Sequence, residues 1–457
     1  MKIFNTLTRS IEEFTPINPP NVGLYTCGPT VYNYAHIGNL RTYVFEDILK
    51  RVLIHNGYEV RHIMNITDVG HLTDDADEGE DKMEAGAVRE GKTAGEIADF
   101  YTRAFQDNLA DLNILPPTFY CKATDNISEQ IKFVQALHDR GFTYETTDGI
   151  YFDTTKLPDY GKLANLDKQD LDAGHRVEVG EKHNLHDFAL WKFSPAGQRR
   201  QMEWAAFGKM GFPGWHIECS AMSMKYLGEQ FDIHCGGVDH IPVHHTNEIA
   251  QSEALTGKKP WVKYWLHGEF LLSGADKMAK SADNFLTLQV LKDAGINPIA
   301  YRYYLLQSHY RKQIGFSWQA LEAAKKGLDN LREQIQKIPD VIKTGTETKE
   351  KFHNAINNDL NTPEALAVIW TAIKNDKLSK NDVAEFDKIL GLDLIKTAMP
   401  TILTEEVSGL LELRLNARKK QDWTESDRLR DLIDSLGYTV KDLPDGEQRV
   451  DRNVKLA

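Results

Sequence analysis

A histidine and a carboxylate share one face of a predicted helix in the middle of the chain. His244 and Glu248 stand four residues apart, and His245 and Glu248 three apart, so their side chains meet on that face. Cys219 precedes them at a predicted loop or helix start, and Cys27 ends a predicted strand. Two thiolates, an imidazole and a carboxylate are a ligand set that suits zinc. The residues alone leave another interpretation open, because buried cysteines are usually inert apolar groups.

A second candidate for chemistry is the stretch Tyr25–Asn39, YTCGPTVYNYAHIGN. It predicts a strand, a glycine-containing turn and the start of a helix whose apolar face is Leu40, Val44, Ile48 and Val52. A helix N-terminus presents unpaired N–H groups and the positive end of the peptide dipole, so we expect His36 and Asn39 to face a phosphate. Gly38 lets a ligand approach the backbone closely.

The elements that position these residues follow from the order of apolar runs. After residue 20, strand-like and helix-like runs alternate, which predicts an α/β fold with a Rossmann-like parallel sheet. The alternation is interrupted after Pro116-Pro117, and long helical patterns replace it beyond about residue 290. We predict a core at 1–115 and 200–290, an inserted connective subdomain at 116–199, an α-helical bundle at 291–400 and a small C-terminal unit at 401–457.

Four local patterns refine this outline. Glu59–Ile66 predicts the second strand, and the acidic run Thr73–Glu84 predicts a solvated loop. Thr93 and Glu96 have the spacing of a capping box at a helix start. Asp148-Gly149 is typical of a hairpin turn.

Composition limits the class of protein. With 457 residues, 41% hydrophobic and 26% charged, the chain is expected to form two or three water-soluble domains. A net charge of −13 confines any RNA partner to local basic patches. The four cysteines, at 27, 121, 219 and 235, include no close pair, which favours a reducing cytoplasm; Cys121 falls in the predicted insertion and is expected to be structural. Neither a signal-peptide core nor a membrane-spanning run is expected, so we predict a cytoplasmic protein without membrane contact.

Two separated motifs carry a family resemblance. HIGN (His36–Asn39) and KMAKS (Lys277–Ser281) resemble the HIGH and KMSKS signatures of class I aminoacyl-tRNA synthetases. NITD (Asn65–Asp68), GWHIECSAMS (Gly214–Ser223) and HHTNEIAQSEA (His244–Ala254), with the stretch that contains HIGN, resemble cysteinyl-tRNA synthetases more specifically. These blocks occur in the family's order over most of the first 290 residues.

The resemblance implies a zinc enzyme that activates cysteine. Cys27, Cys219, His244 and Glu248 fall on the family's ligand positions, which implies one Zn²⁺ per chain. The ion would accept the thiolate of L-cysteine as a further ligand, whereas the hydroxyl of serine is a poorer ligand for a soft metal. His245 is then expected on the substrate side rather than as a further metal ligand.

The same resemblance implies the reaction and its residues. Cysteine attacks ATP, present with Mg²⁺, to give cysteinyl adenylate and pyrophosphate, and the acyl group then moves to tRNA(Cys). The catalytic residues would be His36, Asn39, Lys277 and Lys280. ATP would be bound by these four together with Gly38, Asp239 and Ser281, and the substrates by Thr67, Trp215, Asp239 and His245. Ala279, Asp283 and Cys235 depart from the family pattern.

The C-terminal third is expected to bind tRNA. NNDLNTPEAL (Asn357–Leu366) resembles the family's bundle motif, and RKKQDWTESDRLRDLIDSLG (Arg418–Gly437) resembles its anticodon-binding end. Local basic density there favours phosphate contact: Arg414, Arg418, Lys419, Lys420, Arg428 and Arg430. The resemblance also implies a monomer.

Three other functions share part of this pattern. A ligase that passes cysteine to an amino sugar would have the zinc site and HIGN but not the C-terminal unit. A non-catalytic, synthetase-like RNA-binding protein would have lost HIGN, a lysine of KMAKS or a zinc ligand, and all are present. A nucleotidyltransferase with a HIGH-like motif would be shorter and would need no zinc ligands.

Overall fold

Five parallel strands form the central sheet, in the order β12-β11-β3-β4-β5. Their bounds are β3 Asn21–Thr26, β4 Glu59–Ile66, β5 Phe119–Lys122, β11 Phe231–Gly237 and β12 Val262–Gly268. The chain passes from β3 to β4 and β5 in one direction and from β11 to β12 in the other, so the strand order reverses between β3 and β11. Doubly wound sheets bind ligands at the carboxyl ends of the strands at such a reversal. The predicted α/β fold is confirmed.

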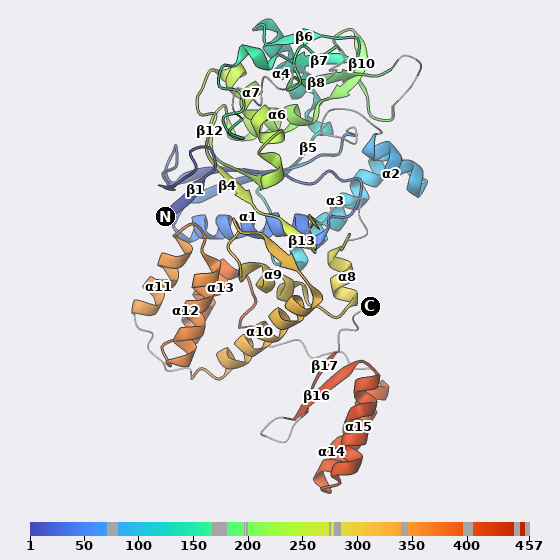
Figure 1. Ribbon diagram of the computed structural model, residues 1–457, viewed down its shortest axis with the longest axis vertical. Helices are drawn as coiled ribbons and strands as arrows, with labels where there is room; N and C mark the ends of the chain where they lie inside the picture. The colour runs from blue at the N-terminus through green and yellow to red at the C-terminus, as the bar shows by residue number, and fades with distance from the viewer. Residues whose placement is uncertain are drawn as a thin grey trace.

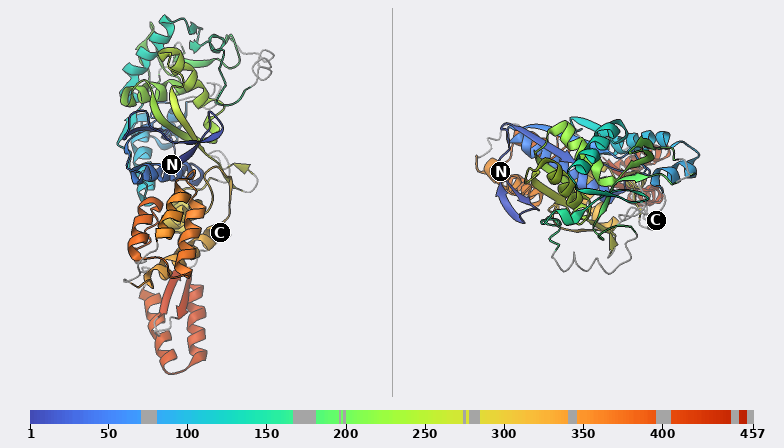
Figure 2. Two further views of the ribbon diagram at one scale, coloured as in Figure 1. Left: turned by 90° about the vertical axis from the view of Figure 1, so that its left-hand side faces the viewer. Right: turned by 90° about the horizontal axis from the view of Figure 1, so that it is seen from above.

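The layers of the molecule follow one another along its long axis (Figure 1 and Figure 2). An antiparallel insertion is at one end, followed by the parallel sheet, a helical bundle and a small C-terminal unit. None of the helices in the described part of the chain has the length and apolar content needed to span a bilayer. The computed structural model describes residues 1–70, 81–166, 181–195, 197, 200–273, 276–277, 285–339, 346–395, 405–442 and 448–452.

Helices cover both faces of the central sheet. On one face lie α1 (Ile37–His55) and α3 (Ala94–Asp111), and α3 has the predicted capping box between Thr93 and Glu96. On the other face lie α6 (Trp215–Leu227) and α7 (His244–Thr256), and α4 (Ile127–Asp139) packs against both. A short hairpin of β1 (Lys2–Asn5) and β2 (Ser10–Glu13) lies beside β12.

The inserted sheet is antiparallel and has the order β6-β7-β8-β10-β9. Its strands are β6 Thr143–Glu145, β7 Gly149–Phe152, β8 Phe188–Phe193, β9 Trp204–Ala206 and β10 Lys209–Pro213. The predicted hairpin turn at Asp148-Gly149 joins β6 to β7.

Two predictions about this region are corrected by the structure. Cys121 lies on β5 at the edge of the parallel sheet, not in the insertion, and the antiparallel sheet extends to Pro213, beyond the predicted limit at 199. A four-residue edge strand after Pro116-Pro117 is too short to show a periodic pattern. Of the predicted acidic loop, 73–80 lie outside the described residues, whereas Glu84 belongs to α2 (Lys82–Glu90), which Asp81 caps.

The bundle is packed against the far side of α1 (Figure 1). Its helices are α8 Leu288–Asp293, α9 Pro298–Leu306, α10 Trp318–Gln336, α11 Thr346–Ile356, α12 Thr362–Lys374 and α13 Lys380–Leu390. A small sheet joins the core to it, with β13 Leu271–Ser273, β14 Asp276–Lys277 and β15 Ile314–Phe316. The C-terminal unit has α14 Glu405–Lys419, α15 Trp423–Ser435, β16 Tyr438–Asp442 and β17 Gln448–Arg452.

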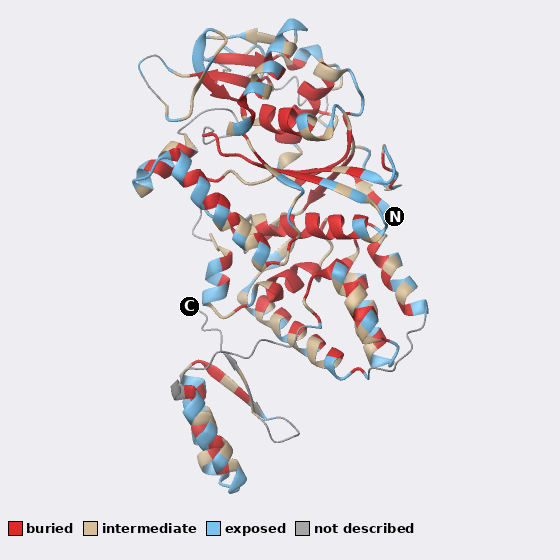
Figure 3. Ribbon diagram, turned by 180° about the vertical axis from the view of Figure 1, so that it is seen from behind, coloured by how far each residue is buried: buried red, intermediate tan, exposed pale blue. Residues whose placement is uncertain are grey.

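Because it lies between the sheet and the bundle, α1 is buried along most of its length (Figure 3). Several of its buried residues are charged, and Asp47 and Arg51 form an ion pair with each other. Asp47 Oδ2 accepts from Arg51 at 2.7 Å and from Arg302 of α9 at 2.5 Å. Arg302 also donates to the carbonyl of Leu390, in α13, at 2.7 Å. These contacts fix α1 against two helices of the bundle.

Replacing Arg302 with methionine should therefore lower the free energy of unfolding by about 3–5 kcal/mol, because it leaves part of a buried charge network unpaired. Lys326→Met is the matched control, since Lys326 is exposed and its ammonium group lies 3.8 Å from Glu322. This substitution should cost less than about 1 kcal/mol. Urea unfolding followed by tryptophan fluorescence measures both variants. Equal stabilities would show that the network does not hold the bundle to α1.

Candidate active site

A crevice of about 960 Å³ lies at the carboxyl ends of β3 and β11. Cys27, Cys219 and His244 line one part of it, and Asn39 and Asp239 line another. A smaller cavity of about 330 Å³ shares Asn39 and Asp239 and adds His36, Gly38 and Glu269. The residues predicted for metal binding and those predicted for phosphate binding therefore face one continuous space.

Four buried side chains converge on the crevice from three elements. Cys27 directly follows β3, Cys219 is in the second turn of α6, and His244 and Glu248 are one turn apart on α7. Each offers one ligand atom, and these atoms all lie within 4.8 Å of one another. This buried Cys/Cys/His/Glu group could hold a metal ion.

The electrostatics of the group favour a cation. Burial alone would raise the pKa of Cys219, but hydrogen bonding with Cys27 and the nearby His244 lower it to about 7. Burial also opposes ionisation of Glu248, yet His234 and His244 lower its pKa to about 2. Cys27 behaves in the opposite way, since burial and Cys219 raise its pKa well above the usual value. His244 carries the compensating positive charge, because Glu248 and Cys219 raise its pKa to about 10 despite burial. The Cys219 thiolate and the Glu248 carboxylate are thus stabilised by an adjacent cation, a role that a divalent ion would take over.

The carboxylate of Glu248 is oriented for coordination. His234 Nε2 lies 3.0 Å from its Oε2. Oε1 is buried and lies 3.0 Å from Nε2 of His244, inside the group. His234 therefore holds Oε2, while Oε1 faces the other three side chains of the group. The donor set and this oxygen both fit a metal ion.

A chain of imidazoles lies behind Cys27. Nε2 of His245 is 3.3 Å from Sγ of Cys27, and its Nδ1 is 2.7 Å from Nε2 of His267. His245 is fully buried and is not among the residues that line the crevice. Together with Cys27, His234 and Glu248, it forms a second, overlapping set of ligand atoms within 4.8 Å. The structure thus places His245 against a cysteine of the group rather than in the open space.

Close backbone packing fixes the position of Cys27. A Cβ added to the next residue, Gly28, would lie 1.6 Å from the carbonyl oxygen of Asn65, and the N–H of Gly28 donates to Oδ1 of Asn65 at 2.7 Å. Both residues line the crevice.

The variant Gly28→Ala should consequently lose about 3 kcal/mol or more of unfolding free energy, because the strand ends must separate. Its metal content should also fall. Gly95→Ala, at an exposed position of α3, is the control, because nothing lies within 4 Å of the added methyl group. Elemental analysis and thermal unfolding measure the two effects, and a stable, metal-replete Gly28→Ala protein would contradict the expectation.

The start of α1 has a defined hydrogen-bond pattern. His36 is the N-cap, and its Nδ1 accepts from the N–H of Asn39 at 3.1 Å, while Oδ1 of Asn39 accepts from the N–H of His36 at 3.3 Å. Because Nδ1 is the acceptor, the proton of a neutral imidazole is on Nε2. His36 is thus both a helix cap and a hydrogen-bond donor.

Of the remaining predicted site residues, some line the crevice and others do not. Trp215 stacks on His244, with 4.2 Å between ring centroids, and lines the crevice together with Asp239. Thr67 is not among the lining residues, and its hydroxyl donates to Glu218 at 3.0 Å. The backbone of Lys277 pairs with Leu272 in the β13–β14 hairpin. Lys280 and Ser281 lie outside the described residues.

Sequence reasoning missed His240, which lies three residues beyond Gly237, the last residue of β11. It lines the crevice, 5.2 Å from the ring of His244 between centroids, and its buried Nδ1 makes no hydrogen bond among the described residues. Burial lowers the pKa of His240 to about 4, so the ring is neutral at pH 7. The sequence feature that could have identified His240 is its position close to the pair His244-His245.

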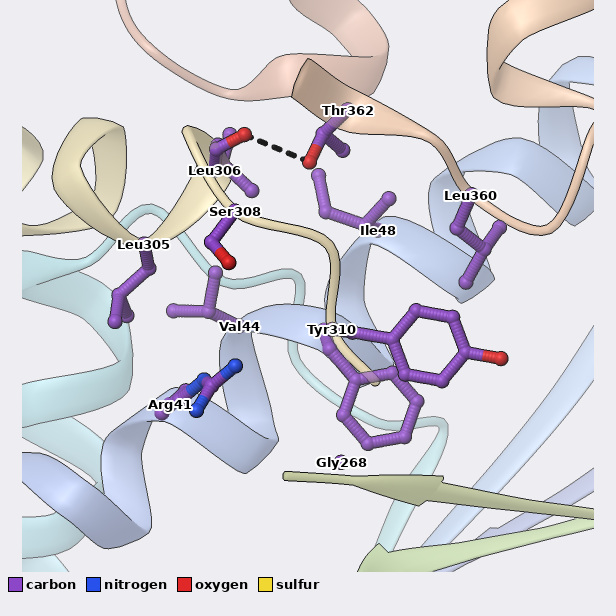
Figure 4. Close-up of a pocket in the computed structure, with 11 residues that line it drawn as sticks. Arg41, Val44, Ile48, Gly268, Leu305, Leu306, Ser308, Tyr310, Leu360 and Thr362 are labelled. Carbon is purple, nitrogen blue, oxygen red and sulfur yellow. Dashed lines mark hydrogen bonds between the residues drawn. The ribbon is translucent and has the colours of Figure 1, made fainter. Parts of the chain in front are cut away.

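Another cavity, of about 380 Å³, lies on the bundle side of α1 (Figure 4). Val44 and Ile48 of α1 line it with Leu305, Leu306 and other mainly apolar groups, and the Thr362 hydroxyl donates to the Leu306 carbonyl at 2.8 Å. Arg41 is the charged residue in its lining, and it donates to the carbonyls of Phe270 and Lys312. Among the described residues, no carboxylate, histidine or cysteine lines this cavity, in contrast to the crevice.

Comparison with known proteins places the chain in a family. The model described as "tRNA synthetases class I (C) catalytic domain" matches residues 13–326, and "Cysteinyl-tRNA ligase anticodon binding domain" matches residues 402–450. A "Cysteine--tRNA ligase 1" of Burkholderia lata is 50% identical over 453 residues, covering 98% of this chain and 96% of the relative. The chain belongs to the cysteine–tRNA ligase family.

Further members of the cysteine–tRNA ligase family and solved structures agree with this assignment. The relative from Treponema denticola is 44% identical over 481 residues, covering 97% of this chain and 98% of its own. A Mycobacterium tuberculosis methionyl-tRNA synthetase in complex with methionyl-adenylate has a TM-score of 0.57 at 14% identity, covering 81% of this chain and 88% of that one. At this identity the match shows the class I synthetase fold alone. The resemblance inferred from the motifs is confirmed.

The family's anticodon-binding unit corrects one expectation. Arg414 is fully buried and pairs with Asp442 at 2.8 Å. Arg418 and Arg430 pair with the same carboxylate, at 3.0 and 3.1 Å. The expectation that Arg414 contacts RNA is wrong, because sequence shows charge but not burial, whereas Arg418 and Arg430 keep 30% and 43% of their side-chain surface exposed. In this cysteine–tRNA ligase the arginine cluster joins α14 and α15 to β16.

Proposed function

We propose that the chain catalyses the ATP-dependent ligation of L-cysteine to tRNA(Cys) through a cysteinyl adenylate. Membership of the cysteine–tRNA ligase family supports the overall reaction. The observation that carries the amino-acid specificity is the buried group of Cys27, Cys219, His244 and Glu248, which faces the same crevice as the N-terminus of α1.

These four residues would hold one Zn²⁺ per chain. A bound zinc ion would accept the thiolate of cysteine and would bind the hydroxyl of serine poorly. The resulting difference in binding free energy would exceed the about 1–3 kcal/mol that an apolar pocket obtains from a small difference between side chains. Trp215 and His240 enclose the space next to His244. Both are suited to shaping a pocket for a small side chain.

The chain's own residues would position and stabilise the first step. ATP, with Mg²⁺, would place its phosphates at the N-terminus of α1, where Nε2–H of His36 and the side chain of Asn39 can donate, and Gly38 allows close approach. A carboxylate oxygen of cysteine bonds to the α-phosphorus as the bond to pyrophosphate breaks. Lys277 and Lys280 would neutralise the leaving pyrophosphate, assisted by Ser281, and Asp239 would hold the ribose or the amino group of the substrate.

In the second step a terminal ribose hydroxyl of tRNA(Cys) bonds to the acyl carbon and AMP leaves. The C-terminal unit would bind the anticodon end. Lys419 and Lys420 are exposed at the end of α14, and Trp423, at the start of α15, is 56% exposed. Exposed lysines suit phosphates, and an exposed indole suits an unstacked base.

We further propose that the enzyme works as a monomer in the cytoplasm. Its four cysteines are free and buried, which suits a reducing compartment. Thr67 and His245 would act from behind the crevice, through Glu218 and Cys27 respectively.

The test is ATP–pyrophosphate exchange with cysteine and serine in parallel, followed by acceptor assays with a tRNA(Cys) transcript and an amino sugar. Exchange with cysteine only, and transfer to the tRNA only, are expected. Transfer to the amino sugar would assign the chain to the other class of cysteine-activating ligase. Absence of exchange with either amino acid would refute the proposed activity.

A further inference from the structure

Three side chains from three helices meet at the opposite end of α1 from the crevice. His55 is the last residue of α1, His353 lies on α11 and Glu385 lies on α13. One ligand atom from each lies within 4.8 Å of the other two. The ring centroids of the two histidines are 4.6 Å apart. The proposed reaction uses none of these residues.

We propose that His55, His353 and Glu385 form a second metal site, which takes a first-row divalent transition ion such as Zn²⁺ and joins α1 to the bundle. Two imidazoles and a carboxylate are borderline ligands of the kind that zinc accepts with an open fourth position. Mg²⁺ and Ca²⁺ prefer sites made of oxygen atoms.

The distances suit a shared ion. Nε2 of His353 lies 3.4 Å from Oε1 of Glu385. Two ligands at about 2.0–2.1 Å from a tetrahedral zinc ion are themselves about 3.3 Å apart. Nε2 of His353 is also buried without a hydrogen bond among the described residues. A polar atom in this position loses its solvation and gains no partner unless an ion supplies one.

The charges around the site leave the required lone pairs free. Lys349 Nζ holds Oε2 of Glu385 at 2.7 Å, so Oε1 is the oxygen that faces His353. Lys349 is also paired with Asp382 at 3.0 Å, which balances its charge beside the site.

The site is accessible to solvent, and its three ligands already lie close together. His353 and Glu385 have 28% and 32% of their side-chain surface exposed, and His55 is also half-buried. An ion can thus enter from solvent and retain a water molecule. Because the three ligands come from α1, α11 and α13, binding would stabilise the folded arrangement of these helices.

Metal stoichiometry of the zinc-loaded protein tests the proposal. Equilibrium dialysis against Zn²⁺ in buffer containing Mg²⁺, followed by elemental analysis, should give two saturable equivalents per chain for the wild type. His353→Ala and Glu385→Gln should each retain one. The midpoint of thermal unfolding should rise with added Zn²⁺ in the wild type beyond the one-equivalent point, and not in these variants.

His138→Ala is the matched control, because His138 lies on the exposed surface of α4, where its ring is hydrogen-bonded to Thr143 at 3.0 Å. It should retain both equivalents. Cys219→Ser should lose the first equivalent and keep the second, so failure of the crevice site and failure of this site are distinguishable. A single equivalent in the wild type that Cys219→Ser removes, or a second one that persists in a His55→Ala/His353→Ala protein, would overturn the proposal.

Discussion

Cys219→Ser protein should purify with about one fewer zinc per chain and should lose cysteine-dependent pyrophosphate exchange by at least about 100-fold. The lower bound follows from the 10–100-fold losses seen when residues that merely support metal ligands are replaced. Cys219 is 1% exposed, and hydrogen bonding with Cys27 and the nearby His244 lower its pKa to about 7 despite burial. A serine hydroxyl at this position would stay protonated and would bind zinc poorly.

Cys121→Ser is the matched control for this experiment. Cys121 is also 1% exposed, but it lies on β5, where its thiol faces the carbonyl of Met64 at 3.6 Å. Its replacement should leave the zinc content unchanged and the exchange rate within about threefold of the wild type. A threefold change in rate corresponds to less than about 1 kcal/mol of activation free energy. Full exchange activity in metal-free Cys219→Ser protein would refute the zinc-based selectivity while leaving the ligase activity intact.

His36→Asn should slow the activation step by about 100–1000-fold, the usual loss when one preorganised donor to a developing charge is removed. Asparagine is a good N-cap, so the helix start should be preserved and the unfolding midpoint should change little. The substitution thereby separates the two roles of His36, the cap through Nδ1 and the donor through Nε2–H. Pyrophosphate exchange at saturating cysteine and ATP measures the first, and thermal unfolding the second.

His36→Ala completes the comparison. It removes both roles, so it should be as slow as His36→Asn and, in addition, less stable by about 1 kcal/mol. If His36→Asn exchanges as fast as the wild type, then His36 serves only as a helix cap, and phosphate binding must depend on Asn39 and the backbone.

Hydrophobic periodicity and turn residues were sufficient to predict most of the helices and strands of the core. The capping box at Thr93, the strand Glu59–Ile66 and the turn at Asp148-Gly149 are all found where local sequence predicts them. Each depends on residues that are close in the chain. The edge strand containing Cys121 and the polar helix Thr346–Ile356 were missed, since the first is too short and the second too hydrophilic to give a clear pattern.

The candidate site, too, could be predicted only where its residues are close together in the chain. The spacing of His244 and Glu248 reveals one helix face, but Cys27 and Cys219 join them only because the strand order reverses beside β3. The alternation of apolar and polar residues in β11 places His234 on one face of the strand, but only the folded protein places Glu248 of α7 beside it. Likewise the burial of Arg414 depends on Asp442 of β16, which only the folded unit places beside it.

The position of α1 also determines which parts of the protein can be separated. One apolar core runs from strand residues such as Leu24, through Val44 of α1, to Leu366 of the bundle, so a chain ended near residue 290 would expose the underside of the catalytic helix. The C-terminal unit has a core of its own, formed by Val407, Ile433, Tyr438 and Val440. The anticodon-binding unit is therefore exchangeable as a module, whereas the bundle is an integral part of the catalytic machinery.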